Sequence, residues 1–237
     1  MTSEDNERST ADAVAPTQLR ADVSRLMAVL AEGGVALAPL DVAYAILAMR
    51  ESGIRRIFAA KRRSYDKPSG MFGSAVLSAE LHDMPADRHA MVAELVAEED
   101  FPFSVVAPFH ADHPLLQTVD PFVLASSSKA GTLDMLINAG QFHDEIARQV
   151  RETGRPVFGS SANLSLSGSK YRLRDIDAEV REAADIEFDY GTSRYANDAG
   201  RSSTIIDFRD FHVVRVGVCF DRVEAAFATR FAVTLKV

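Results

Sequence analysis

The chain has 237 residues, of which 47% are apolar, and this suffices for the buried core of one large domain. Its formal net charge of −8 excludes attraction to nucleic acid by bulk charge, so that any anion-binding site must be a local basic cluster. No apolar run approaches the roughly 18 to 20 residues of a membrane-spanning helix, which excludes an integral membrane protein of that kind.

The first sixteen residues are polar and end at Pro16. They lack the basic and then apolar order of a signal peptide, and they offer few apolar side chains to hold them on a core. We therefore expect a disordered tail over residues 1–16 and a single domain over residues 17–237. The single cysteine, Cys219, excludes an internal disulfide framework and favours a reduced, cytoplasmic location.

Apolar periodicity predicts helices and strands that alternate along the rest of the chain. In a first helix at 17–34, Leu19, Val23 and Leu26 recur at helical spacing, and Gly33 supplies a stop signal. Further helices are expected at 52–61 with Ser52 as N-cap, at 86–100 with Asp87 as N-cap, at 140–154, at 173–184 and after residue 220. Strands are expected at 35–40, 70–77, 103–109, 122–128, 132–137, 155–160, 202–208 and 212–217, with one more at the end of the chain. This interleaving lacks a strict strand–helix–strand rhythm, and so it predicts an α/β fold with a mixed, twisted sheet.

Several common catalytic signatures are absent from the sequence. It has no Walker GxxxxGK[ST] loop, no GxGxxG dinucleotide motif and no GxSxG nucleophile elbow. The pair His110 and His113 has no Cys or carboxylate at zinc-site spacing, so that no side chain is predicted to be a metal ligand. The segment SSSKAG at 126–131 is interpreted as a polar loop.

A basic segment at 59–70, AAKRRSYDKPSG, follows the helix predicted to end near residue 60. Within seven residues it holds Lys61, Arg62, Arg63 and Lys67. Before Pro68 the chain is expected to be extended, so that Lys61 and Arg63 share a face and suit two contacts to one polyanion. By itself the segment is better explained as a solvated basic helix end, which the helix dipole favours.

A segment rich in serine, GRPVFGSSANLSLSGSK at 154–170, follows a predicted strand. Small residues at a strand end let backbone N–H groups and hydroxyls approach a phosphate closely, and Asn163 adds an amide. The alternative is a polar loop with a capping role, which is the commoner function of such residues.

Together the two segments resemble the signature of the YrdC/Sua5 (YciO/YrdC/YwlC) family, the threonylcarbamoyl-AMP synthases. In that family a KxR element and an SxN element face each other across a concave basin, as Lys61-x-Arg63 and Ser161-x-Asn163 would here. PVFGSSANLSLSG is similar to the family's P-[LV]-x-x-T-S-A-N-x-S-G run. GRSSTIIDFRDFHVVRVG matches its Ser-Thr, apolar pair and Asp, followed by an apolar pair, Arg and Gly. The resemblance extends from about residue 18 to about residue 218.

The sequence departs from the family where the amino acid is recognised. GGVALAPLDVAYAI fits the family's G-G-[VI]-[VI]-x-x-P-T-[DE]-T-x-Y-G-L in register, but Leu40, Val42 and Ala45 replace its Thr, Thr and Gly. The family's apolar-R-apolar-P segment corresponds to MLINAGQ, in which Leu136 replaces the arginine and Asn138 the proline. Loss of these polar partners weakens recognition of a polar substrate. By this resemblance, the sequence keeps the family's elements that face the phosphates, whereas residues at the positions that recognise threonine are replaced.

The resemblance implies a YrdC-like α/β fold, a twisted mixed sheet with helices packed around a large open concave basin. It also implies an enzyme in which an amino acid captures bicarbonate as a carbamate, whose oxygen attacks the ATP α-phosphate and releases pyrophosphate. That chemistry needs positioning and cationic stabilisation rather than a nucleophilic side chain. The catalytic residues implied are Lys61 and Arg63. The residues implied to bind ATP and its phosphates, with Mg²⁺ as cofactor, are Lys61, Arg63, Lys67, Ser161, Asn163, Ser203 and Arg215. The substrate pocket implied consists of Leu40, Val42 and Tyr44.

Three functions remain open at this point. The first is threonylcarbamoyl-AMP synthesis for tRNA modification, with ATP, an amino acid and bicarbonate as ligands and tRNA or tRNA-modification proteins as partners. The second is a divergent member of the family with another substrate or without catalysis. The third is a nucleotide- or RNA-binding module, against which the acidic net charge counts.

Overall fold

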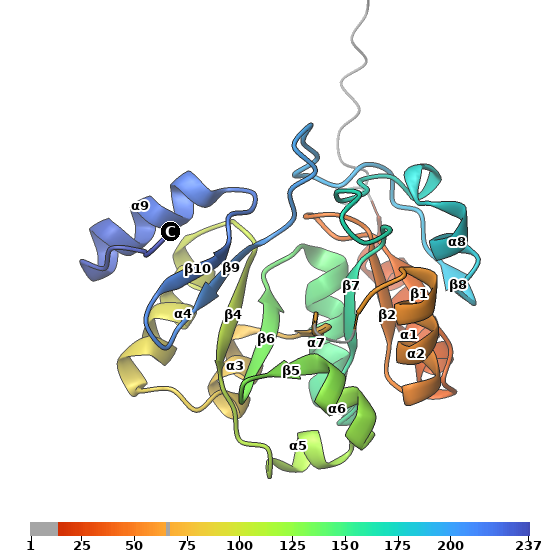
Figure 1. Ribbon diagram of the computed structural model, residues 1–237, viewed down its shortest axis with the longest axis horizontal. Helices are drawn as coiled ribbons and strands as arrows, with labels where there is room; N and C mark the ends of the chain where they lie inside the picture. The colour runs from red at the N-terminus through yellow and green to blue at the C-terminus, as the bar shows by residue number, and fades with distance from the viewer. Residues whose placement is uncertain (1–13, 65–66) are drawn as a thin grey trace, which may run out of the picture.

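The computed structural model describes residues 14–64 and 67–237, and every strand among them belongs to one sheet (Figure 1). The strand order is β10-β9-β4-β6-β3-β7-β2-β1-β8, and β5 pairs with β6 beside this path. The strands are β1 (Ala36–Ala38), β2 (Ala45–Ala48), β3 (Gly70–Phe72), β4 (Phe103–Pro108), β5 (Ser128–Lys129), β6 (Thr132–Ile137), β7 (Phe158–Ser161), β8 (Ile186–Glu187), β9 (Thr204–Asp207) and β10 (His212–Arg215).

Helices flank this sheet, and α7 lies behind its middle strands in Figure 1, with α4 and α9 toward one edge and α1, α2 and α8 toward the other. The helices are α1 (Pro16–Ala31), α2 (Glu51–Ala60), α3 (Ala75–Leu81), α4 (Ala86–Glu98), α5 (Pro114–Gln117), α6 (Pro121–Ser127), α7 (Gln141–Thr153), α8 (Ala178–Arg181) and α9 (Phe220–Phe231), with a 3₁₀ turn at Leu173–Asp175.

The sheet is mixed, as the sequence predicts. Strand β3 pairs parallel with β6, β4 with β9 and β1 with β8, whereas β4 with β6, β2 with β7 and β9 with β10 are antiparallel. Strands distant in the chain thus become neighbours, because β4 lies between β6 and β9. Because β6 runs antiparallel to both β7 and β9, the segments after β7 and β9 leave the sheet at the same end, opposite to the segment after β6.

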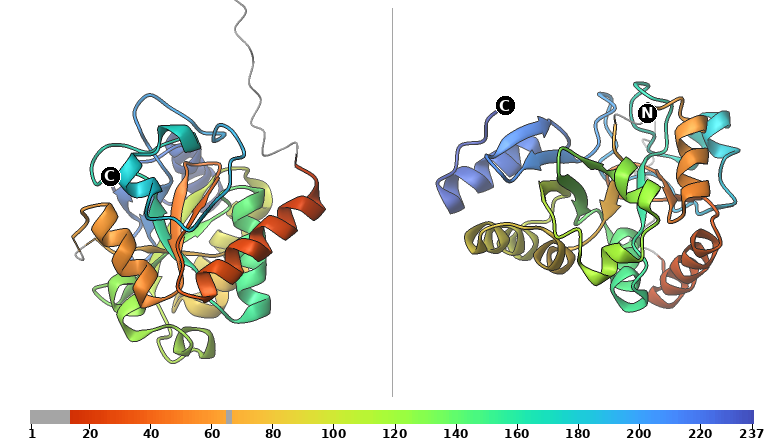
Figure 2. Two further views of the ribbon diagram at one scale, coloured as in Figure 1. Left: turned by 90° about the vertical axis from the view of Figure 1, so that its right-hand side faces the viewer. Right: turned by 60° about the horizontal axis from the view of Figure 1, so that its bottom comes forward.

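The core is built from the apolar faces that the periodicity predicts. Val23, Leu26 and Leu30 of α1 have no exposed surface, and neither do Ile146 and Val150 of α7. The two helices pack against each other (Figure 2). Burial of each such side chain contributes roughly 1.5 to 3 kcal/mol, so that this helix pair is a main source of stability.

One predicted strand is wrong and another is too long, because local helix-start signals override their apolar runs. Of the strand predicted at 122–128, residues 122–127 form most of helix α6 and only Ser128 belongs to a strand, β5. Helix α6 begins with Pro121, a residue suited to the first helical position. The strand predicted at 70–77 ends at Phe72 and gives way to α3. The hydroxyl of Ser74 there accepts a hydrogen bond from the N–H of Leu77 at 3.2 Å and caps the helix.

Other predicted elements are shorter or begin elsewhere. The helix predicted at 173–184 is reduced to a 3₁₀ turn and the single-turn helix α8. The predicted last strand is reduced to one bridge between His212 and Lys236. Neither proposed N-cap is correct, since Ser52 and Asp87 both lie inside the first turn of their helices.

Strand β2 is missed by the sequence analysis, because AILA lacks the alternation that identifies a strand. Of the predicted tail, residues 1–13 lie outside the described residues, and α1 begins at Pro16. In the described part of the chain, no helix combines the length and the apolar character that crossing a membrane requires.

Candidate functional site

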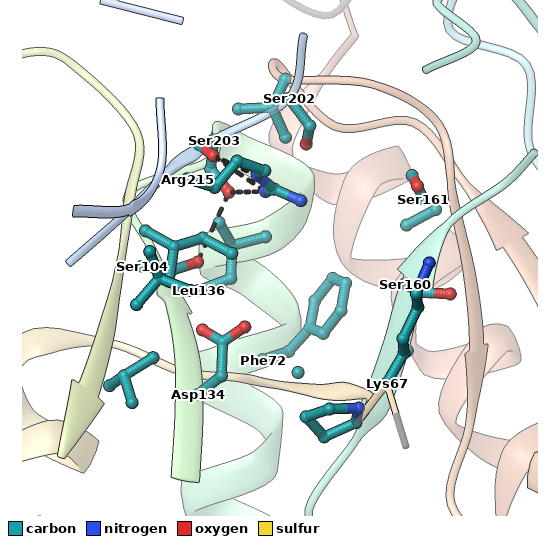
Figure 3. Close-up of a pocket in the computed structure, with 18 of the residues that line it drawn as sticks. Lys67, Phe72, Ser104, Asp134, Leu136, Ser160, Ser161, Ser202, Ser203 and Arg215 are labelled. Carbon is teal, nitrogen blue, oxygen red and sulfur yellow. Dashed lines mark hydrogen bonds between the residues drawn. The ribbon is translucent and has the colours of Figure 1, made fainter. Parts of the chain in front are cut away.

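A cavity of about 830 Å³ opens over the middle of the sheet (Figure 3). Strands β4, β6, β7 and β9 contribute to its lining, together with the chain at 40–45 and at 67–68. In Figure 3 Lys67, Ser160 and Ser161 lie on one side, and Ser203 and Arg215 on the other. Its volume lies within the range of about 300 to 1,000 Å³ that is typical of small-molecule and cofactor sites.

The lining of this cavity carries an excess of positive charge. Its basic residues are Arg63, Lys67, Lys129, Arg209 and Arg215, and its acidic residues are Asp134 and Asp207. Five positive and two negative side chains give a local excess of +3 in a chain whose net charge is −8. Arg209 is bound to Asp207 at 2.7 Å, so that this pair neutralises itself. The remaining charges make the cavity a local site for an anion.

Arg63 is held in place by backbone carbonyls at the edge of the cavity. Its Nε donates to the Lys67 carbonyl at 2.9 Å, and its Nη2 donates to the Pro68 carbonyl at 2.7 Å. Burial lowers the pKa of Arg63, and the charge of Arg215 lowers it further. The guanidinium stays protonated at neutral pH, because arginine begins from a pKa above 12. The cavity therefore has one positioned cation on this side.

Lys61 has a different surrounding from Arg63. Its ammonium donates to the Ser161 carbonyl, to the Asn163 carbonyl at 2.6 Å and to the Asn163 side-chain oxygen at 3.5 Å. Its side chain is 1% exposed, and it does not contribute to the cavity lining. Burial lowers the pKa of Lys61 to about 7, with a further contribution from the charge of Arg63. Lys61 joins the end of α2 to the loop after β7.

The expectation that Lys61 and Arg63 share a face is wrong. The chain is not extended here but turns, since Arg62 adopts a left-handed conformation with φ 50°. The N–H of Arg63 donates to the Phe58 carbonyl at 2.9 Å, which closes the turn on α2. The turn directs Lys61 toward the loop and Arg63 toward the cavity.

The serine-rich segment lies beside the basic segment, as the signature suggests. Ser160 and Ser161 line the cavity at the end of β7. The Ser161 hydroxyl donates to the side-chain oxygen of Asn163, whose amide donates to the Leu164 carbonyl at 2.6 Å. Asn163 is 7% exposed and lies outside the lining, so that its side chain orders the loop.

Gly159 allows β7 to approach its neighbour closely. A Cβ on Gly159 would lie 2.5 Å from the Ile46 carbonyl oxygen of β2, too close for any other residue without a backbone shift. This close approach fixes where the serines emerge from the sheet. It explains why the apolar run before Ser160 ends at a glycine.

On the opposite side Arg215 binds Ser203. Its Nε and Nη2 donate to the Ser203 carbonyl at 3.0 and 2.8 Å, and Nη2 also donates to the Ser203 hydroxyl at 3.0 Å. Both residues line the cavity, and the Ser104 hydroxyl lies 3.4 Å from that of Ser203 (Figure 3). A second guanidinium is thus oriented by neutral acceptors.

The third part of the lining is apolar. Leu40, Val42 and Tyr44, the implied substrate pocket, all line the cavity, as do Phe72 and Leu136. The Tyr44 hydroxyl lies 3.0 Å from the Asp189 carboxylate and accepts the N–H of Tyr190 at 3.2 Å. The Tyr44 hydroxyl is therefore engaged within the protein, and only the aromatic ring of Tyr44 is left to contact a ligand.

Sequence reasoning missed eight polar residues of the lining, namely Ser104, Lys129, Thr132, Asp134, Ser160, Ser202, Asp207 and Arg209. A signal for Asp134 existed, because it is the one charged residue in the apolar strand TLDMLI. Thr132, Asp134 and Leu136 are every second residue of β6 and all line the cavity, as expected for residues on one face of a strand. Over residues 14–64 and 67–237, no group of three or more His, Cys, Asp or Glu side chains is arranged to hold a metal ion.

This fold and cavity define a class of α/β proteins in which a twisted mixed sheet carries an open, predominantly basic basin. The chain belongs to the Sua5/YciO/YrdC family, whose model, described as "Telomere recombination", matches residues 28–217. No curated protein matches the sequence.

Solved structures share the fold at low sequence identity. The hypothetical protein smu.1377c from Streptococcus mutans UA159 is 21% identical over 88% of this chain and 91% of its own, with a TM-score of 0.75. Sua5 from P. abyssi, complexed with L-threonine, is 19% identical over 90% of this chain and 58% of its own, with a TM-score of 0.66. Full-length HypF, in a phosphate- and nucleotide-bound form, is 12% identical over 86% of this chain and 32% of its own, with a TM-score of 0.60. The chain thus spans nearly all of smu.1377c and little more than half of Sua5.

Proposed function

We propose that the chain is an ATP-dependent, carbamoyl-adenylate-forming enzyme that resembles the threonylcarbamoyl-AMP synthases but takes a less polar amino acid, and that it acts in the cytoplasm. The observation that carries this proposal is the pair Arg63 and Arg215, two guanidinium groups oriented by neutral acceptors in one cavity. Further support comes from the relatives, because Sua5 is described in complex with L-threonine and HypF with phosphate and nucleotide.

In the proposed reaction the carbamate of an amino acid attacks the α-phosphate of ATP, and pyrophosphate leaves. Arg63 and Arg215 neutralise the charge on the phosphates, and the Ser203 hydroxyl donates to a phosphate oxygen. The Ser161 hydroxyl, which donates to Asn163 in the free protein, would turn to donate to a phosphate oxygen when the ligand binds. Lys61 and Asn163 act as positioning residues, because they hold the loop that presents Ser161. Lys67, exposed at the cavity edge, adds a further positive charge. Mg²⁺ bound with the triphosphate would help to offset its charge.

The amino-acid side of the cavity supports a substrate other than threonine. Leu40, Val42 and Leu136 offer no hydrogen-bond partner to a hydroxyl or a carboxylate. A site of this kind favours an apolar side chain of similar shape, such as that of valine.

The nucleotide part of the proposal is tested by titrating ATP and Mg²⁺ into the Arg63→Ala variant in a calorimeter. Loss of charge-assisted hydrogen bonds worth about 1.5 to 3 kcal/mol should weaken ATP binding by roughly 10- to 100-fold. The matched control is Arg62→Ala, which removes the same charge from an exposed side chain paired with Glu179 at 2.6 Å. An equal loss in both variants would contradict a specific role for Arg63.

The substrate part is tested by pyrophosphate release from ATP and bicarbonate with L-threonine or L-valine. Two polar groups of threonine left without partners, at a cost of about 1 to 3 kcal/mol each, should weaken the binding of threonine by roughly a hundredfold relative to a true synthase. Valine should therefore support release at least as well as threonine. Pyrophosphate release with threonine at a rate on the order of 1 per second, and faster than with valine, would refute the proposal that the substrate is not threonine. Retention of RNA with a steep salt dependence, without ATP binding, would favour a binding module.

A further inference from the structure

Asp134 lies at the middle of β6 and lines the same cavity as the two arginines. In Figure 3 its carboxylate projects into the pocket, between the sides that carry Lys67 and Arg215. Gly70 faces it from the neighbouring strand β3, where a Cβ would lie 3.4 Å from the Asp134 Oδ2. The sheet therefore leaves space next to a carboxylate at the centre of the proposed phosphate site.

One oxygen of this carboxylate lacks a partner. Oδ1 of Asp134 is buried and has no hydrogen-bond partner among the described residues. Burial raises the pKa of Asp134, opposed by the charge of Arg215, a hydrogen bond with Ser104 and the charge of Arg63. The other acid of the lining, Asp207, is bound by Arg209 at 2.7 Å. A carboxylate that is poorly compensated in the free protein is suited to binding a cation.

Binding of a triphosphate would increase this imbalance. Arg63 and Arg215 are the positive charges that Asp134 experiences, and the proposed function assigns both to the phosphates. With both guanidinium groups neutralised, the Asp134 carboxylate would face phosphate oxygens of like charge. A cation between carboxylate and phosphate removes that repulsion.

We propose that Asp134 is the protein ligand of the divalent cation that accompanies the bound triphosphate, an inference that rests on the proposed nucleotide function. Mg²⁺ prefers oxygen ligands, keeps several waters and is usually held by one or two carboxylates together with substrate phosphates. A single carboxylate next to a phosphate site fits that pattern. It also fits the lack of a three-residue metal cluster in the described parts of the chain.

The test compares ATP affinity with Mg²⁺ and with EDTA in the wild-type chain, Asp134→Asn and Asp207→Asn, by calorimetry. In the wild type, Mg²⁺ should tighten ATP binding by about tenfold or more. In Asp134→Asn this enhancement should fall below about threefold, and ATP without Mg²⁺ should bind more tightly than in the wild type, because a repulsive charge is gone. Asp207→Asn, which removes an equal charge from the same lining, should keep the wild-type enhancement.

A second readout uses Mn²⁺ in place of Mg²⁺. Enhancement of water proton relaxation by Mn²⁺ and ATP should be large with the wild type and with Asp207→Asn, and reduced with Asp134→Asn. Equal Mg²⁺ enhancement and equal Mn²⁺ relaxation in the wild type and Asp134→Asn would overturn this inference and leave the proposed function standing. Absence of ATP binding with either cation would overturn both.

Discussion

At the scale of single residues, two basic side chains two positions apart in the sequence have opposite surroundings. Lys61 is buried against three acceptor oxygens of one loop, whereas Arg63 lies at the cavity. Three acceptors match the three N–H groups of an ammonium, but burial lowers its pKa to about 7. These two effects oppose each other, and the pH dependence of stability distinguishes which of them dominates.

We predict that the wild type gains stability over Lys61→Met as the pH rises from about 7 toward 10. The lowered pKa means that the folded state releases the Lys61 proton in this range while the unfolded state still holds it, so that stability rises with pH. The slope should approach about 1.4 kcal/mol per pH unit. Urea denaturation of both proteins at several pH values measures the difference, in which other titrating groups cancel. A flat difference would mean that the three acceptors keep the ammonium charged.

At the scale of elements, the centre of the sheet depends on two paired glycines. Gly70 of β3 and Gly159 of β7 face each other in register, where β7 also pairs with β2. Strand β7 is thereby held between two neighbours, and its end presents Ser160 and Ser161 to the cavity. Packing at Gly159 therefore controls the position of the serines.

Gly159→Ala is expected to destabilise the fold by about 1 to 3 kcal/mol, as overpacking does. The new Cβ would lie 2.5 Å from the Ile46 carbonyl oxygen, and backbone cannot yield as a flexible side chain does. Gly70→Ala is the matched control, because its nearest atom would lie at 3.4 Å. Chemical denaturation of the two variants should give a clear loss only for Gly159→Ala. Similar stabilities would show that β2 and β7 are not packed closely there.

At the scale of the whole molecule, an acidic chain concentrates positive charge at one place. The cavity gathers its basic residues from the chain after α2, from β5, from β10 and from the turn before β10, on both sides of the sheet centre in Figure 1. A ligand that binds there contacts segments from both sides of the sheet. Occupation of the cavity should then stabilise the fold as a whole.

ATP with Mg²⁺ at a hundred times its Kd should raise the free energy of unfolding by about 2.7 kcal/mol. For a chain of this length each kcal/mol shifts the Tm by about 2 to 4 °C. Adenosine at the same concentration lacks the phosphates that the arginines attract, and should give a smaller shift. Thermal unfolding followed by circular dichroism measures both. An equal shift with adenosine would mean that the phosphates do not supply the affinity.

Sequence alone determined the features that depend on local order. Periodicity identified the buried faces of α1 and α7, and the serine-rich and basic segments identified the family and, of the cavity lining, Arg63, Lys67 and Ser161. Tertiary structure decided which side chains face the cavity. The left-handed turn at Arg62 separated Lys61 from Arg63, and the pairing of β6 with β3 placed Asp134 opposite Gly70. The physical reason is that periodicity reports which face of an element is buried. The direction of a side chain at a turn and the neighbours of a strand depend on contacts between residues distant in sequence.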